Sequence, residues 1–412
     1  MSAQLSPVEA YRRDLARQGR TAPFGDEDDG WILLAHVLGR RALSGAVDEE
    51  VPADESSALR RLAASVAKAA TVGDEQAAAV MDAAARMESA GALLLAASAL
   101  GSLTRILDDG TRPLVLGRAI AQWARVERML GGSDVAADLY RRASALGTRA
   151  RAPDLRVRAD LGLGVLARMR GNYPEARRRF RRALALAERE GLAELTGLAH
   201  QSLLVAAAVA RDFDTALSHG WSALAHVAGV PAKEAEVLLN LATLCLDTGH
   251  DAAALQGFLE AAERTDRVAF RIGAQAGAAV AAARVGDRSV LLRCAAAVER
   301  ALEGGMTPYE SAQRLLTLSD AWRAAGEHER EESARRRGLE IARAYGFAEL
   351  VHEYERHATA DPASEAASPA PSTALGPGAR RVVGALAALG ESRAPLTGAS
   401  HSPPPRDSGG EG

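Results

Sequence analysis

The most regular stretch of the chain runs from Arg156 to Gly191 and reads RVRADLGLGVLARMRGNYPEARRRFRRALALAEREG. Apolar residues recur at helical spacing through its first half, and a turn follows at Gly171-Asn172. Pro174 stands where a second helix would open, a position that tolerates proline because the missing N–H has no partner there. The second half then carries the stripe of an amphipathic helix, at Ala176, Phe180, Ala183 and Leu184. The stretch therefore predicts two antiparallel helices joined by a tight turn.

The same pattern returns about every forty residues, which is the signature of a repeat protein. Glycine stands at the turn of every unit but the fourth, in the series Gly91, Gly131, Gly171, Arg211, Gly249, Gly286 and Gly326. A small residue is typical five places later, at Ala96, Ala136, Ala176, Ala216, Ala254, Leu291 and Glu331. A packing position follows nine places after the turn, at Leu100, Tyr140, Phe180, Gly220, Phe258, Ala295 and Arg335. These columns predict units that begin near residues 77, 117, 157, 197, 235, 272 and 312.

The third unit resembles the tetratricopeptide repeat (TPR) family. The resemblance rests on Gly164, Gly171, Tyr173, Ala176, Phe180 and Ala183, which match the small, turn and aromatic positions of that pattern. It implies an all-α solenoid of about seven antiparallel helix pairs. The units are longer than the roughly 34 residues of a standard TPR, and are similar to long units in bacterial regulator sensor domains and large scaffold proteins. We expect the additional residues to lengthen the second helix or the loop after it.

The two ends of the chain depart from the repeat. Residues 1–76 are interpreted as a helical N-terminal cap, because terminal repeats must cover an apolar face, and residues 77–358 as the solenoid. Residues 359–412 are rich in Ala, Pro, Ser and Gly, which predicts a disordered tail. Within the tail, Arg380–Leu389 (RRVVGALAAL) has two interpretations. It is either a transient helix without a partner or a peptide that docks in a groove of this same protein.

Charge and cysteine content limit the classes of function. The net charge of −3 argues against a general nucleic-acid binder. Only Lys68 and Lys233 are lysines among 50 basic residues; the arginine excess fits a GC-rich genome, and it slightly favours an anionic partner. Cys245 and Cys294 lie in apolar helical stretches, so we expect buried free thiols and a cytoplasmic protein. No uncharged run is long enough to predict a membrane span.

No motif predicts catalysis, a cofactor or a bound metal. Gly162 and Gly164 match a loose dinucleotide-binding pattern, but the residues before them are helical, and that motif requires a preceding strand. His219 and His226 could share a helix face, although no third metal ligand is evident. The basic cluster Arg177–Arg182 is read as a solvated helix face, with a weak contact to nucleic acid or an acidic protein as the alternative. We therefore expect a protein without enzymatic activity.

The family resemblance places ligand-facing residues on the first helix of each unit, which lines the concave groove. On the present units these positions hold Arg118, Gln122, Arg125, Arg158, Gln201, Ser202, Asn240 and Thr243. Amides and hydroxyls can bind a peptide backbone, and arginine can clamp a carboxylate. The alternative is that these are only the polar positions that any exposed helix must have. The set lacks the complete lysine, asparagine and arginine clamp of the family's chaperone-tail binders.

Three functional hypotheses follow. The first is a scaffold or adaptor that binds a partner peptide or protein in the groove, the partner being acidic if the arginines are used. The second is a signal-sensing regulatory module that responds to a peptide or small ligand. The third, an enzyme on a solenoid framework, lacks any paired acid and base in the sequence. None of these hypotheses predicts a membrane, a specific nucleic acid or a particular oligomeric state.

Overall fold

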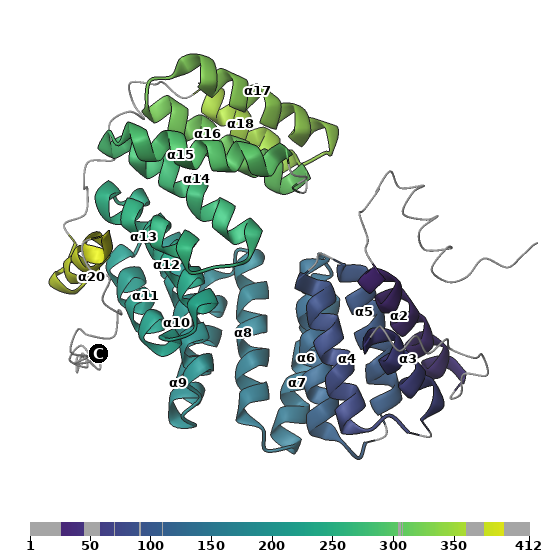
Figure 1. The fold of residues 1–412 in the computed structure, drawn as a ribbon. Helices are drawn as coiled ribbons and strands as arrows, with labels where there is room; N and C mark the ends of the chain where they lie inside the picture. Colours follow the sequence, from purple (N-terminus) through teal and green to yellow (C-terminus); the bar gives the residue numbers. More distant parts are fainter. Residues whose placement is uncertain are drawn as a thin grey trace, which may run out of the picture. The chain divides into compact units, whose positions relative to one another are not determined.

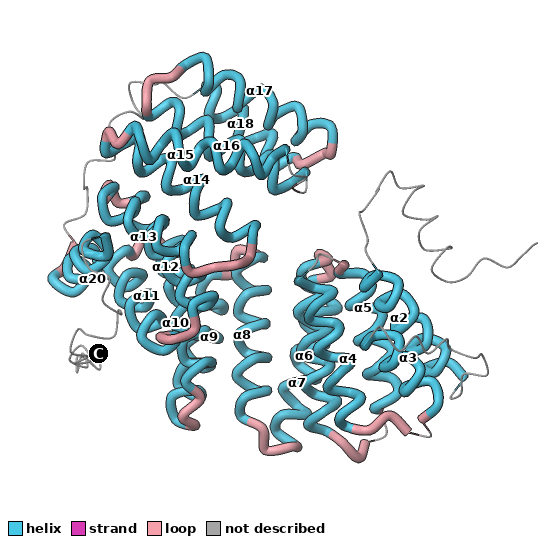
Figure 2. The backbone as a smooth tube through the Cα atoms, viewed as in Figure 1, coloured by secondary structure: helices cyan, strands magenta, loops and turns pink. Residues whose placement is uncertain are grey.

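The structure is a computed structural model that describes residues 26–44, 58–69, 71–89, 92–108, 110–303, 306, 308–359 and 375–390. Every regular element in these residues is helical (Figures 1 and 2). The chain divides into two compact units, residues 1–195 and residues 196–412, and the boundary falls near the start of one helix. The predicted all-α repeat fold is confirmed. Its division into a cap (1–76) and a solenoid (77–358) stays a proposal.

The first compact unit is built from consecutive helices that each pack against their neighbours. In chain order they are α2 (Asp26–Ser44), α3 (Ala58–Lys68), α4 (Asp74–Ser89), α5 (Leu93–Leu107), α6 (Pro113–Met129), α7 (Ser133–Arg149), α8 (Pro153–Met169) and α9 (Tyr173–Arg189). The pairs α4–α5, α6–α7 and α8–α9 are the first three predicted repeats. Helices α2 and α3 pack against each other, with α2 against α5 and α3 against α4.

The second compact unit continues the same pattern. Its helices are α10 (Ala193–Val209), α11 (Phe213–Val227), α12 (Pro231–Asp247), α13 (Asp251–Glu263), α14 (Val268–Val285), α15 (Arg288–Glu303), α16 (Pro308–Ala324), α17 (His328–Ala344), α18 (Ala348–Thr359), α20 (Pro377–Ala387) and the 3-10 helix η1 (Ala388–Gly390). The helix pairs from α10–α11 to α16–α17 are repeats four to seven. Helix α18 packs against α17 and covers the last pair.

The turns explain the forty-residue period. Six of the seven predicted turn residues are described, and all six have left-handed backbone conformations, from Gly131 (φ 88°) to Gly326 (φ 72°). Each ends a helix in the same way: for example, the Gly131 N–H donates to the Arg128 carbonyl and the Gly132 N–H to the Glu127 carbonyl. This is the Schellman hydrogen-bond pattern, in which glycine is favoured because it has no Cβ to clash. The seventh turn residue, Gly91, lies outside the described residues.

A second series of left-handed residues falls halfway between these turns. Gly110, Arg151, Gly191 and Gly229 close connections from one repeat to the next, and Gly346 closes the connection from the last repeat to α18. From α6 to α10 every helix has 17 residues and every connection has three. The additional residues of the unit are therefore shared by its two helices, whereas we expected them in the second helix or the loop after it. Both helices have the same length because the same turn recurs about every twenty residues.

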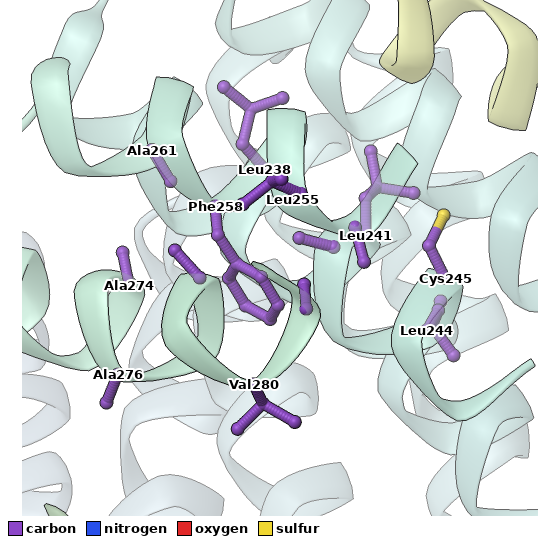
Figure 3. Close-up of a cluster of buried hydrophobic side chains, with 14 of the residues drawn as sticks. Leu238, Leu241, Leu244, Cys245, Leu255, Phe258, Ala261, Ala274, Ala276 and Val280 are labelled. Carbon is purple, nitrogen blue, oxygen red and sulfur yellow. The ribbon is translucent and has the colours of Figure 1, made fainter. Parts of the chain in front are cut away.

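Aromatic rings of the second helices pack against glycines of the first helices. A Cβ at Gly162 would overlap the ring of Tyr140, and a Cβ at Gly164 would overlap the ring of Phe180. Phe258 meets Gly277 in the same manner in the second unit. Its ring lies within the cluster of small and branched side chains that forms the core there (Figure 3). These contacts explain the glycines that resemble a dinucleotide-binding motif, since both lie within α8.

The C-terminal region differs from expectation over part of its length. The sequence assigned residues 359–412 to a disordered tail, but residues 375–390 include α20 and η1, which pack against the second unit. Leu375, Val382 and Leu386 are each no more than 6% exposed. The assignment is wrong there because apolar residues at helical spacing outweigh the Pro, Gly and Ala composition around them. Residues 360–374 and 391–412 lie outside the described residues.

Candidate peptide-binding surface

The first helices of neighbouring repeats in the first unit are joined by polar side chains of α6. The Gln122 Nε2 group donates to the Met81 carbonyl of α4 at 2.9 Å. Arg125 forms an ion pair with Glu88 of α4 at 2.5 Å, and Arg118 forms one with Asp154 of α8 at 3.4 Å. Three of the predicted groove residues thus lie together on α6 and contact the helices on either side of it.

The two paired arginines remain accessible. The Arg118 side chain is 54% exposed and that of Arg125 is 49% exposed. Their carboxylate partners are less accessible, since the side chain of Glu88 is 11% exposed and that of Asp154 is 29% exposed. Arg158 on α8 is also exposed and makes no ion pair within the described part of the chain. The guanidinium groups of Arg118 and Arg125 are therefore anchored by carboxylates on one side, and each still has N–H donors that no described residue uses.

The other four predicted residues belong to the second unit. The hydroxyls of Ser202 and Thr243 donate to carbonyls one helical turn earlier, at Leu198 and Leu239, each at 2.9 Å. Such bonds leave the hydroxyl oxygen able to accept a further hydrogen bond. The half-buried amides of Gln201 (on α10) and Asn240 (on α12) make no side-chain hydrogen bond to any described residue. The predicted set therefore forms two surfaces: Arg118, Gln122, Arg125 and Arg158 in one unit, and Gln201, Ser202, Asn240 and Thr243 in the other.

The basic cluster of α9 is largely explained by structure. Arg179 and Arg182 both bind Asp160 of α8, a carboxylate whose side chain is only 6% exposed. Arg178 and Arg179 also pair with Glu175 at the start of their own helix. Two arginines thus compensate a buried charge, as burial of a carboxylate requires. Arg181 remains exposed on the same helix.

The sequence did not reveal a third histidine beside His219 and His226. His200 of α10 lies with its Nδ1 atom 2.9 Å from that of His219, and its ring stacks on His226 with centroids 5.8 Å apart. Burial, and then repulsion from the imidazoles of His219 and His226, lowers the pKa of His200 to about 4. The repeat period could have found this residue, because His200 stands forty residues after Asp160 and His219 forty after Arg179.

Side chains suited to metal binding do not converge in the described part of the chain. No group of three or more His, Cys, Asp or Glu residues there could hold a metal ion, the histidine cluster included. Cys245 and Cys294 are both buried free thiols, as the sequence predicted. Burial raises the pKa of the Cys245 thiol to about 12, so it stays protonated and is a poor nucleophile.

Comparison with known proteins identifies the fold. No family model and no curated protein matches the chain. Among solved structures, a Rap protein complexed with competence and sporulation factor is similar, with 12% identity and a TM-score of 0.51 over 83% of this chain and 93% of that one. A signal transduction ATPase with a tetratricopeptide repeat sensor, from Pyrococcus horikoshii, has 12% identity and a TM-score of 0.50. That match covers 83% of this chain but only 57% of the ATPase.

These similarities establish a TPR-like helical-repeat fold, as the resemblance in the sequence implied. At this identity they show the fold alone. The helices of the described residues also include none with the length and apolar character needed to cross a bilayer.

Proposed function

We propose that this protein is an interaction module, a scaffold or adaptor, that holds a peptide or protein segment on its first-helix surfaces. The observation that carries the proposal is the placement of Arg118 and Arg125 on α6. Both guanidinium groups are about half exposed and both are held by carboxylates of adjacent helices. This arrangement orients two strong donors toward a surface that a ligand can reach.

An acidic peptide fits this chemistry. A ligand carboxylate could bind the N–H donors of Arg118 and Arg125 that Glu88 and Asp154 leave unused, and so gain charge-assisted hydrogen bonds without breaking either ion pair. The existing carboxylates reduce the positive potential of the surface, so selectivity would come from geometry more than from net charge. In the second unit, the amides of Gln201 and Asn240 supply donors and acceptors for a peptide backbone.

The proposal includes a non-enzymatic role in the cytoplasm. The described residues contain no pairing of nucleophile and base that would suggest otherwise. The protonated, buried thiols also argue against a redox function for either cysteine.

A signal-sensing module is the second candidate. It is favoured by the two structural neighbours, one of which is complexed with competence and sporulation factor while the other carries a repeat sensor. In this case ligand binding would change the arrangement of the repeats. Solution scattering with and without the captured ligand separates the two: compaction on binding supports sensing, and an unchanged profile supports a scaffold.

The proposal is tested by capturing partners from native cytoplasm with the full chain. Wild type is compared with a variant carrying Arg118→Glu, Arg125→Glu and Arg158→Glu. A matched control carries Arg141→Glu, Arg178→Glu and Arg181→Glu, which reverse three exposed arginines of the second helices α7 and α9. We expect a partner that is retained by the wild type and the control but lost from the first variant. Equal capture by all three proteins would refute a first-helix binding surface.

A further inference from the structure

Helix α20 has one apolar face, and that face is buried. Ala379, Val382 and Leu386 follow the spacing i, i+3 and i+7, which places them on one side of the helix, and Leu375 lies two residues before its first residue. All four are at most 6% exposed. The side chains of Arg380, Arg381 and Ala387 are exposed. The segment therefore has the form of an amphipathic helix whose apolar side is covered.

The covering surface is formed by the second helices of two repeats. Helix α20 packs against α11 and α13, and η1 continues the contact along α13 (Figure 1). Its apolar residues belong to the same core cluster as Leu217 of α11 and Leu255 of α13. At its start, the Gly376 N–H donates to the Asp214 carboxylate of α11 at 2.7 Å. The surface thus fixes both the apolar face and the beginning of the helix.

We propose that this face of α11 and α13 is a binding site for an amphipathic helix, and that α20 is a detachable ligand which it holds in cis. The sequence of α20 supports detachment. An isolated helix of 11 residues is not stable in water, so α20 is helical because it is docked. Gly384 weakens the helix further, since it lies in the interior, is exposed and makes no close contact.

The connection to the rest of the chain permits exchange. Residues 360–374 separate α20 from the end of α18, and an extended chain of that length spans up to about 50 Å. A tethered ligand competes with a free one through its high effective concentration. The kind of partner that fits the vacated site is an amphipathic helix with aliphatic residues at the spacing of Ala379, Val382 and Leu386. This is a helix-in-groove mode of recognition. The site is separate from the first-helix surfaces, so either proposal can fail without the other.

The test uses a fluorescent peptide of residues 373–391 added to three full-length proteins. These are the wild type, Val382→Glu, which places a charge on the buried face, and Ala387→Glu, which places the same charge on the exposed face. We expect Val382→Glu to bind the peptide about tenfold more tightly than the wild type, because its own helix no longer occupies the site. Ala387→Glu should match the wild type. Equal affinity for Val382→Glu and the wild type would overturn the proposal.

A second measurement does not depend on the charged variant folding. Hydrogen exchange is followed in the wild type and in Gly384→Ala, which stabilises α20 without touching the site. We expect α20 amides to exchange faster than those of α12 in the wild type, and roughly two- to fivefold more slowly in Gly384→Ala. If α20 amides exchange at the rate of those in α12, α20 is an integral part of the core and the proposal is wrong. A concentration-dependent dimer lost in Val382→Glu would also overturn it, because the occupant would then be a second copy.

Discussion

The third and fourth repeats, α8–α9 and α10–α11, share one backbone plan but fill it with different side chains. Phe180 faces Gly164 in the third repeat, whereas Gly220 faces Leu204 at the corresponding positions of the fourth, with Leu241 of α12 closer still. The buried pair of Asp160 and Arg179 is replaced by His200 and His219. Gly171 at the turn is replaced by Arg211, which keeps the left-handed conformation at φ 58°. The fold thus conserves volume and backbone geometry, while the chemistry at each position varies.

The largest effect should come from breaking the size complementarity. Gly164→Leu in the third repeat introduces a side chain where Phe180 already lies, and we expect a loss of about 3 kcal/mol or more in the free energy of unfolding. Urea denaturation measures it. Adding Phe180→Gly recreates the arrangement of Leu204 and Gly220, so the double variant should recover at least about 1 kcal/mol relative to Gly164→Leu. If the loss in the double variant equals the sum of the losses in Gly164→Leu and Phe180→Gly, the two positions are independent and the prediction is wrong.

The next effect is a dependence of stability on pH that comes from His200 in the fourth repeat. His200 has a folded-state pKa of about 4, below its ordinary value of 6.5, first because of burial and then because His219 and His226 repel its charged form. Between pH 6.5 and 4 the unfolded chain binds a proton that the folded chain does not, so the free energy of unfolding falls as the pH falls. The shift corresponds to at most about 3 kcal/mol, none of it lost above pH 6.5.

A transplant tests this assignment. The double variant His200→Asp and His219→Arg copies the pair of the third repeat and should flatten the stability profile between pH 6.5 and 4. His328→Gln is the control, because His328 is 79% exposed and contributes no buried imidazole. The prediction is contradicted if wild type and transplant lose stability in parallel as the pH falls.

The comparison also shows what the sequence could and could not predict. The glycine column located the turns, because a left-handed residue in a Schellman motif has a strong preference for glycine. The half-period was not predicted, although its described residues are also glycines except for Arg151. His200 and Asp160 were not predicted, because the sequence around a polar residue does not show that it is buried until its partner in space is known. For the eight groove residues, the sequence predicted the helix on which each one lies. Only the structure showed that Arg118, Gln122 and Arg125 already have partners.

A smaller effect separates the two turns. Arg211→Gly relieves a left-handed arginine and should stabilise the protein by about 1 kcal/mol, whereas Gly171→Arg should destabilise it by a similar amount. No atom lies within 4 Å of the position where a Cβ would stand at Gly171, so the effect reports backbone conformation alone. Thermal melting of both variants, compared with Gly378→Ala as a glycine without positive φ, measures it. Shifts of the same sign in Arg211→Gly and Gly171→Arg would contradict the explanation.

The smallest effect concerns the residue after each turn, which caps the next helix. Asn172 accepts a hydrogen bond from the Glu175 N–H, and Asp212 accepts one from the Thr215 N–H, both at 3.2 Å. Removing either cap by substitution with alanine should cost about 1 kcal/mol. The charged cap of the fourth repeat has an additional favourable interaction with the helix dipole, roughly 0.3 kcal/mol or more at low salt.

Asp212→Ala should therefore lower the free energy of unfolding more than Asn172→Ala does in dilute buffer, and this difference should shrink in 1 M NaCl. His250, which occupies the same place before α13 without a side-chain cap bond, provides the comparison, and His250→Ala should show no such salt dependence. If the difference between the Asp212 and Asn172 variants persists at high salt, its cause is the geometry of the cap. The helix dipole would then not distinguish the two repeats.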